Sequence, residues 1–252
     1  MPNWCVNRLS VVGKMRQVKK IQDQILVENP KSEQIYFKFN NVIKMPEELD
    51  LEESTVFSTP HEILFGESYE TAADLTNQEN AEEPVPFVVP PIIVEGYGED
   101  RCRVFKVWVA RQIRKPGSQE EFSKACFNYE NKANIRQMNI TKFGHASWYA
   151  WRIDNWGTKW DACDCSIIQE LIVPPEGGDG DSPNAKVYVR YEFNTAWGPP
   201  IPIIKKLGQM FPKVKFKLRY FECGVGFQGT LVIKKGEVLV DESGEYNGRL
   251  GG

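Results

Sequence analysis

The segment Lys186–Phe193, K-V-Y-V-R-Y-E-F, places an apolar side chain at every second position. A period of two is typical of a β-strand that buries one face. The predicted inward residues are Val187, Val189, Tyr191 and Phe193. Tyr188 and Arg190 then belong to the opposite face. No other segment predicts a strand as strongly, so the rest of the fold is built outward from it.

A second strand is predicted just before this one. The segment Pro174–Asn184, P-P-E-G-G-D-G-D-S-P-N, has the composition of a turn. Before the turn, Cys163–Val173 has the apolar and β-branched content of a strand. We therefore expect the two strands to form a hairpin.

A helix and three strands are predicted on the C-terminal side. Pro199-Pro200 and Pro212 bound an amphipathic helix, and its apolar stripe is Ile203, Ile204, Leu207, Met210 and Phe211. In the following strand the apolar residues Val214, Phe216, Leu218 and Tyr220 alternate with the cations Lys213, Lys215, Lys217 and Arg219. Thr230–Ile233 and Glu237–Val240 predict a terminal hairpin, after which we expect Glu242–Gly252 to be frayed.

The N-terminal part repeats the order of strand and helix. Asn7–Gly13 predicts a strand, Lys14–Val27 an amphipathic helix and Ile35–Phe39 a second strand. Two β-α-β halves make a ferredoxin-like fold, in which two helices cover one face of an antiparallel sheet. We therefore predict an α+β protein with a ferredoxin-like core in residues 1–44 and 156–252.

The residues between the two halves are predicted to form a long inserted subdomain, 45–155. Its first part, 45–100, is acidic, and its second part, 101–155, is basic and mainly helical. Arg101–Arg114 is compatible with a helix or an extended segment, whereas Gln119–Asn155 favours helix. Val85–Val94 contains three prolines, and we expect it to be extended.

The net charge of -3 conceals a strong asymmetry. Met45–Asp100 carries fifteen carboxylates and no lysine or arginine, so this segment has a charge of -15 and the remainder +12. One interpretation is a solvated acidic insertion, and the other is a surface that binds a basic host protein. The candidate partner-binding residues are Glu47, Glu48, Asp50, Glu52 and Glu53.

Four of the seven tryptophans lie within residues 148–160. Trp148 and Trp151 are one helical turn apart and fit a structural role in the core. Alternatively, aromatic rings beside cations form a pocket that binds a small ligand or nucleotide, with or without catalysis. The candidate ligand-binding residues are Trp156, Lys159, Trp160, Asp161, Trp197 and Glu222.

Motifs of catalysis and cofactor binding are weak. Cys163 and Cys165 form a Cys-x-Cys pair, but no second pair or nearby histidine completes a metal site. Gly224–Gly229 spells G-x-G-x-x-G after a predicted strand of an antiparallel sheet, where a turn is the better explanation. We expect no metal and no cofactor, and we expect binding rather than catalysis.

The cations that face away from the predicted core allow two interpretations. A row such as Lys213, Lys215, Lys217 and Arg219 is commonly a solvated face. Ferredoxin-like sheets also bind RNA, and Tyr188 and Tyr191 supply aromatic rings, but the glycine-aromatic signature of RNA-recognition strands is missing. Nucleic acid therefore stays a possible partner.

The composition, with 41% hydrophobic and 26% charged residues, is that of a folded soluble protein. No apolar run is long enough to span a bilayer, and the N-terminus does not have the pattern of a secretory signal. Six cysteines in 252 residues fit reduced thiols. We expect a cytoplasmic protein, in the cytoplasm of a host cell, without a membrane partner.

Four segments resemble the YubB-type ferredoxin-like family of phages and conjugative plasmids. They are Met1–Leu9 (MPNWCVNRL), Trp151–Asp161 (WRIDNWGTKWD), Phe193–Pro200 (FNTAWGPP) and Tyr220–Gly229. The resemblance implies a ferredoxin-like fold and a mobile-element origin, but no established activity. Because it surrounds the acidic segment without covering it, our leading hypothesis is a host-takeover or anti-defence factor that acts through that segment.

Overall fold

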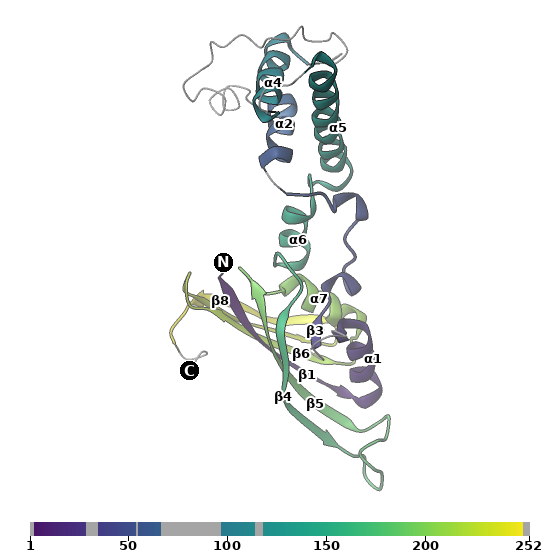
Figure 1. The fold of residues 1–252 in the computed structure, drawn as a ribbon. Coiled ribbons are helices and arrows are strands. Elements are labelled where there is room, and N and C mark those ends of the chain that lie inside the picture. Colours follow the sequence, from purple (N-terminus) through teal and green to yellow (C-terminus); the bar gives the residue numbers. More distant parts are fainter. Residues whose placement is uncertain (1–2, 29–34, 54, 67–96, 114–117, 249–252) are drawn as a thin grey trace. The chain divides into compact units, whose positions relative to one another are not determined.

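The structure is a computed structural model that describes residues 3–28, 35–53, 55–66, 97–113 and 118–248 (Figure 1). The chain divides into two compact units. One consists of Met1–Met45 and Trp151–Gly252, and the other of Pro46–Ala150. The predicted α+β class is confirmed, because the first unit contains the ferredoxin-like sheet and the second is built mainly from helices.

The first unit is organised around a six-stranded antiparallel sheet with the order β4-β5-β1-β6-β7-β8. Its strands are β1 (Trp4–Lys14), β4 (Cys163–Val173), β5 (Lys186–Ala196), β6 (Lys215–Glu222), β7 (Phe227–Lys234) and β8 (Glu237–Glu245). β1 lies in the middle and pairs antiparallel with β5 and β6. The four strands β4, β5, β1 and β6 therefore have the ferredoxin-like order, and the β7–β8 hairpin extends one edge.

The alternation of β5 places its predicted inward residues in the core. Val187, Val189, Tyr191 and Phe193 are at most 3% exposed. Phe37 packs edge-on against Phe193 with ring centroids 4.6 Å apart. The Tyr191 hydroxyl has a hydrogen-bond partner inside the core, because Gln22 Nε2 donates to it at 2.8 Å. Burying four such side chains drives one face of β5 inward.

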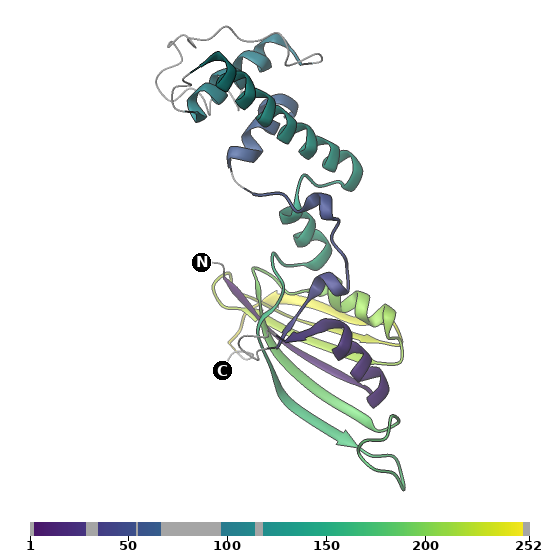
Figure 2. The ribbon, with the colours of Figure 1, turned by 45° about the vertical axis from the view of Figure 1, so that its right-hand side comes forward.

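Two helices cover this buried face (Figure 2). α1 (Met15–Ile25) turns Met15, Val18, Ile21 and Ile25 inward at helical spacing. α7 (Ile201–Met210) does the same with Ile203, Ile204 and Leu207. The sequence predicts both stripes, since residues three and four apart share one side of a helix. The opposite face of the sheet carries neither helix and is called the open face below.

Three predicted boundaries were wrong. The first helix ends at Ile25 rather than Val27, because β2 (Leu26–Glu28) pairs with β3 (Ile35–Phe37) in a small separate sheet. The β3 strand stops at Phe37, and Phe39–Asn41 forms a 3-10 turn. Residues Glu242–Glu245 are not frayed, because they pair with β7 as the end of β8.

The second unit is mainly helical. It contains the 3-10 turn η2 (Glu47–Leu49), α2 (Thr55–Phe65), α4 (Glu99–Gln112) and α5 (Gln119–Phe143). Its core includes Ile63, Phe105, Val109 and Phe122, all fully buried. α4 resolves the ambiguity of Arg101–Arg114 in favour of helix.

α2 was not foreseen from the sequence, and the predicted extended stretch Val85–Val94 lies outside the described residues. α6 (Trp148–Trp156) leads from the second unit back to the first. Within the part of the chain that the structure describes, no helix combines the length and apolar content needed to cross a bilayer.

Candidate functional site

The open face of the sheet concentrates positive charge on its three central strands. Arg8 on β1, Arg190 on β5, and Lys217 and Arg219 on β6 line one cavity of about 210 Å³. The same cavity is lined by Ser10, Ile168 and Glu192. These seven residues are called the basic cavity below. It carries four cations and a single carboxylate, which makes it suited to an anionic ligand.

Strand register assembles the cavity. Ser10 is paired with Arg190 on one side and with Lys217 on the other. One pleat along β1, Arg8 is paired with Glu192 and Arg219. Residues directly opposite on antiparallel strands point to the same face. Two neighbouring rows across the sheet therefore bring together cations that are far apart in the sequence.

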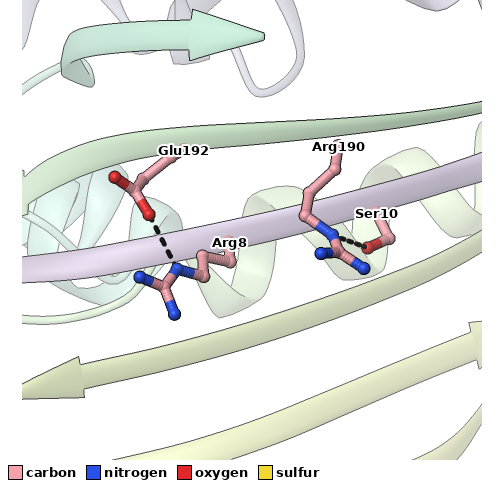
Figure 3. Close-up of polar contacts among 4 residues, drawn as sticks. All are labelled: Arg8, Ser10, Arg190 and Glu192. Carbon is pink, nitrogen blue, oxygen red and sulfur yellow. Dashed lines mark hydrogen bonds and ion pairs between the residues drawn. The ribbon is translucent and has the colours of Figure 1, made fainter. Parts of the chain in front are cut away.

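Two of the cations are held in place by neighbours (Figure 3). Arg8 Nε donates to Glu192 Oε2 at 2.7 Å, and Arg190 Nε donates to Ser10 Oγ at 3.4 Å. Arg190 Nη2 also donates to the Tyr188 hydroxyl, which lies on the same face. These contacts orient two guanidinium groups that line the cavity, and the planar fork of a guanidinium matches the oxygens of a phosphate or carboxylate.

The fourth strand contributes an apolar wall through a β-bulge. Between Ile167 and Gln169 the register of β4 against β5 shifts by one residue, and Ile168 is the extra residue. A bulge redirects the side chain of the inserted residue. Ile168 thereby lines the basic cavity, although it is 46% exposed. The cavity thus offers one apolar contact beside its cations.

Exposed tryptophans lie at the start of β1. Trp4 is 40% exposed and Trp160 is 37% exposed, with ring centroids 6.2 Å apart. The Lys159 ammonium lies 4.6 Å from the centre of the Trp160 ring. Trp4 occupies an open-face position of β1, four residues before Arg8. Aromatic rings are therefore available on the same strand as the basic cavity.

The six predicted ligand-binding residues separate into buried and exposed ones. Trp156 is 1% exposed, and its Nε1 donates to Ile43 O at 2.9 Å. Asp161 Oδ1 accepts a 2.7 Å hydrogen bond from Phe39 N. Burial raises the pKa of Asp161, and its hydrogen bonds and nearby cations oppose that change. Both side chains hold the segment 39–43 against the end of α6.

Glu222 is also used inside the fold. It is 4% exposed and accepts hydrogen bonds from the backbone N–H groups of Gly224, at 2.7 Å, and Val225. The G-x-G-x-x-G segment thereby forms the turn between β6 and β7. Trp197, which is 47% exposed, has a positive φ of 72° and donates its backbone N–H to Asn3 O. Lys159, Trp160 and Trp197 are thus the predicted residues that face solvent.

The predicted partner-binding carboxylates are exposed, and two of them pair with cations of α5. Glu48 Oε1 accepts from Lys142 Nζ at 2.8 Å, and this bond lowers the pKa of Glu48. Glu53 Oε1 lies 3.5 Å from Arg136 Nη2. Residues 67–96, which carry more of the acidic charge, lie outside the described part of the chain.

The Cys-x-Cys pair lies at the beginning of β4. Cys163 Sγ is 3.8 Å from Asn194 O, and Cys165 Sγ is 3.8 Å from Cys163 O. Burial raises the pKa of Cys163 to about 11 and that of Cys165 to about 12. Among the described residues, no three or more His, Cys, Asp or Glu side chains gather as metal ligands.

Most of the basic cavity was missed as a site in the sequence. Lys217 and Arg219 appeared there only as part of a cation row, and Arg190 only as an outward residue. Arg8, Ser10, Ile168 and Glu192 were not among the predicted site residues. Alternation alone assigns each of these residues to a face, but the cavity depends on the register between strands, which alternation does not reveal.

The fold and the cavity define a ferredoxin-like α+β protein with a basic open sheet face. Residues 182–250 match the model of a family described as "Ferredoxin-like domain in Api92-like protein". The match includes α7 and the strands β6, β7 and β8. It confirms the predicted ferredoxin-like relationship at the level of this domain.

Among solved structures, the chain is similar to the crystal structure of protein Api92 from Yersinia pseudotuberculosis. The two share 14% sequence identity, and the comparison covers 98% of this chain and 99% of that chain with a TM-score of 0.37. No curated protein sequence matches the chain.

Proposed function

We propose that this protein binds single-stranded nucleic acid on the open face of its ferredoxin-like sheet. The observation that carries the proposal is the basic cavity, with four cations against one carboxylate. A groove of cations that follows a phosphate backbone supplies most of the affinity of such proteins. Because the helices cover the other face, the open face is accessible along β1, β5 and β6.

The tryptophans favour single strands over a duplex. Bases that are not paired stack on aromatic rings, and each stacked base contributes about 1 to 3 kcal/mol. Trp4 and Trp160 are exposed near the start of β1, and Lys159 adds a cation beside Trp160. In this arrangement the backbone contacts the cations while bases stack on the two rings. Two of the predicted ligand-binding residues, Lys159 and Trp160, thus take part.

The proposal is tested by fluorescence anisotropy with labelled single-stranded RNA, single-stranded DNA and duplex DNA of the same sequence. The test variant combines Lys217→Glu with Arg219→Glu, two exposed residues of β6. The matched control combines Lys19→Glu with Lys20→Glu, two exposed residues of α1. Both double variants change the net charge by the same amount, but only the first alters the open face.

We expect the wild-type protein to bind a single strand with an affinity that falls steeply as salt rises from about 50 to 200 mM. In the β6 variant, loss of two phosphate contacts lowers the slope of log K against log salt by about 1.4, since each contact to a single strand contributes about 0.7. The α1 variant should keep the wild-type slope. Equal losses in the two variants, or equal affinity for the duplex, would contradict the proposal.

A second candidate function follows from the exposed carboxylates after Met45. Asp50 and Glu52 face solvent, and a carboxylate-rich surface competes with phosphate for a cationic protein. Binding to a basic host protein, as by a phage- or plasmid-encoded takeover or anti-defence factor, stays a prediction. A lysate pull-down with Glu47, Glu48, Glu52 and Glu53 changed to Gln checks it, and unchanged partners at low and high salt would reject it.

A further inference from the structure

The helical unit contains a second cavity, unrelated to the open face of the sheet. Its volume is about 330 Å³, and it is lined by Leu51, Glu52, Lys132, Ile135 and Arg136. Leu51 and Glu52 lie between η2 and α2, while the other three residues share one side of α5. This volume falls at the lower end of the range for small-molecule sites, which are mostly apolar with a few polar groups.

Arg136 is buried in this cavity without adequate partners. Its side chain is 9% exposed. Its Nε and Nη1 atoms are buried and have no hydrogen-bond partner. Nη2 is 3.5 Å from Glu53 Oε1, which is longer than the 2.7–2.9 Å of a charge-assisted hydrogen bond. Arg136 therefore holds a full positive charge with at least three unsatisfied N–H groups.

Such an arrangement is unfavourable for the fold by itself. A buried donor without a partner costs about 1–3 kcal/mol, and a charged donor costs more. Replacing a buried charged group by an apolar one of similar volume is often neutral or stabilising. The retention of an arginine at this position is explained when a ligand supplies the acceptors that the protein does not.

We propose that this cavity binds a small monocarboxylate with an apolar body. The planar guanidinium of Arg136 presents paired N–H groups that match the two oxygens of a carboxylate. Leu51 and Ile135 provide apolar walls for the body of the ligand. Glu52 and Glu53, which lie beside the arginine, disfavour a dianion such as phosphate through like-charge repulsion.

Isothermal titration calorimetry of the full chain with sodium benzoate tests the proposal. Benzamide, which has the same shape and no charge, and inorganic phosphate are the comparison probes. The test variant is Arg136→Met, and the matched control is Lys124→Met on an exposed turn of the same helix. We expect wild type and Lys124→Met to bind benzoate in preference to both other probes, and Arg136→Met to bind it at least tenfold more weakly.

Thermal unfolding supplies a second readout. Without ligand, Arg136→Met should unfold at the same temperature as wild type or higher, because an unsatisfied buried charge is removed. If that variant does not fold, Arg136→Lys is used, which keeps the charge but loses the planar fork and should also weaken benzoate binding. The proposal is overturned if wild type does not bind benzoate, if benzamide or phosphate binds as tightly, or if neither Arg136 variant weakens binding.

Discussion

Replacing Gly157 by alanine should destabilise the sheet unit more than a glycine replacement at an open turn. Gly157 follows α6 with φ of +81° and donates its N–H to Ile153 O at 2.9 Å. A Cβ atom at this position would lie 2.5 Å from Pro199 O and 3.0 Å from Pro202 Cδ. The backbone after α6 and the backbone before α7 therefore approach too closely for any side chain.

The expected cost has two parts. The left-handed conformation costs an alanine about 1–2 kcal/mol. Displacing a backbone carbonyl and a proline ring to make room for a methyl group costs about 1–3 kcal/mol more. Gly226 supplies the control, because it has φ of +88° in the turn between β6 and β7 and a Cβ atom there would meet no other atom within 4 Å. Gly226→Ala should therefore lose only the first part.

Urea unfolding of wild type, Gly157→Ala and Gly226→Ala, followed by circular dichroism, measures the difference directly. Both glycines belong to the unit formed by Met1–Met45 and Trp151–Gly252, so the two variants report on the same unfolding transition. We expect Gly157→Ala to be less stable than Gly226→Ala by about 1–3 kcal/mol. Equal free energies of unfolding for the two variants would refute the close approach of the two backbones.

Two further predictions concern titratable groups. Burial lowers the pKa of His61 below its usual 6.5, so the folded state binds fewer protons than the unfolded state and stability should fall as pH drops through 6.5. His61→Gln should remove this part of the pH dependence in thermal melts, and an unchanged pH profile would contradict it. Burial raises the pKa of Cys5 and Cys165 to about 12 and that of Cys126 to about 11, whereas Cys223 is exposed. Cys223 should therefore react fastest with a thiol reagent near neutral pH, and labelling of Cys5 in the folded protein at the same rate would show that the burial is wrong.

The sequence predicted the parts of the fold that have a clear period. The alternation in β5 and β6 and the stripes of α1 and α7 identified these elements, since burial of one face imposes the period. β2 and β3 are three residues each, which is too short to show alternation. α2 was missed because Pro60 lies inside it and disfavours a helix locally. Its burial of Ile63 and Leu64 in the helical core overrides that preference.

The candidate sites were harder to predict than the fold for a physical reason. The basic cavity needs Ser10 opposite both Arg190 and Lys217, and this register is set by long-range strand pairing. The Arg136 cavity depends on where the segment after η2 packs along α5, which no local pattern encodes. By contrast, Trp156 and Glu222 stood out in the sequence, yet both bind the chain's own backbone.

The residues that form the most specific sequence patterns therefore build the scaffold, and the proposed binding surface lies elsewhere. Asn7 shows this directly: it is fully buried, and its Nδ2 donates to Cys5 O and Thr195 Oγ1, whereas its neighbour Arg8 points to the open face. Adjacent positions on one strand thus serve the core and the surface separately. It follows that charge changes at Lys217 and Arg219 can remove binding while the fold is retained, whereas changes at Asn7 or Glu222 alter the fold itself.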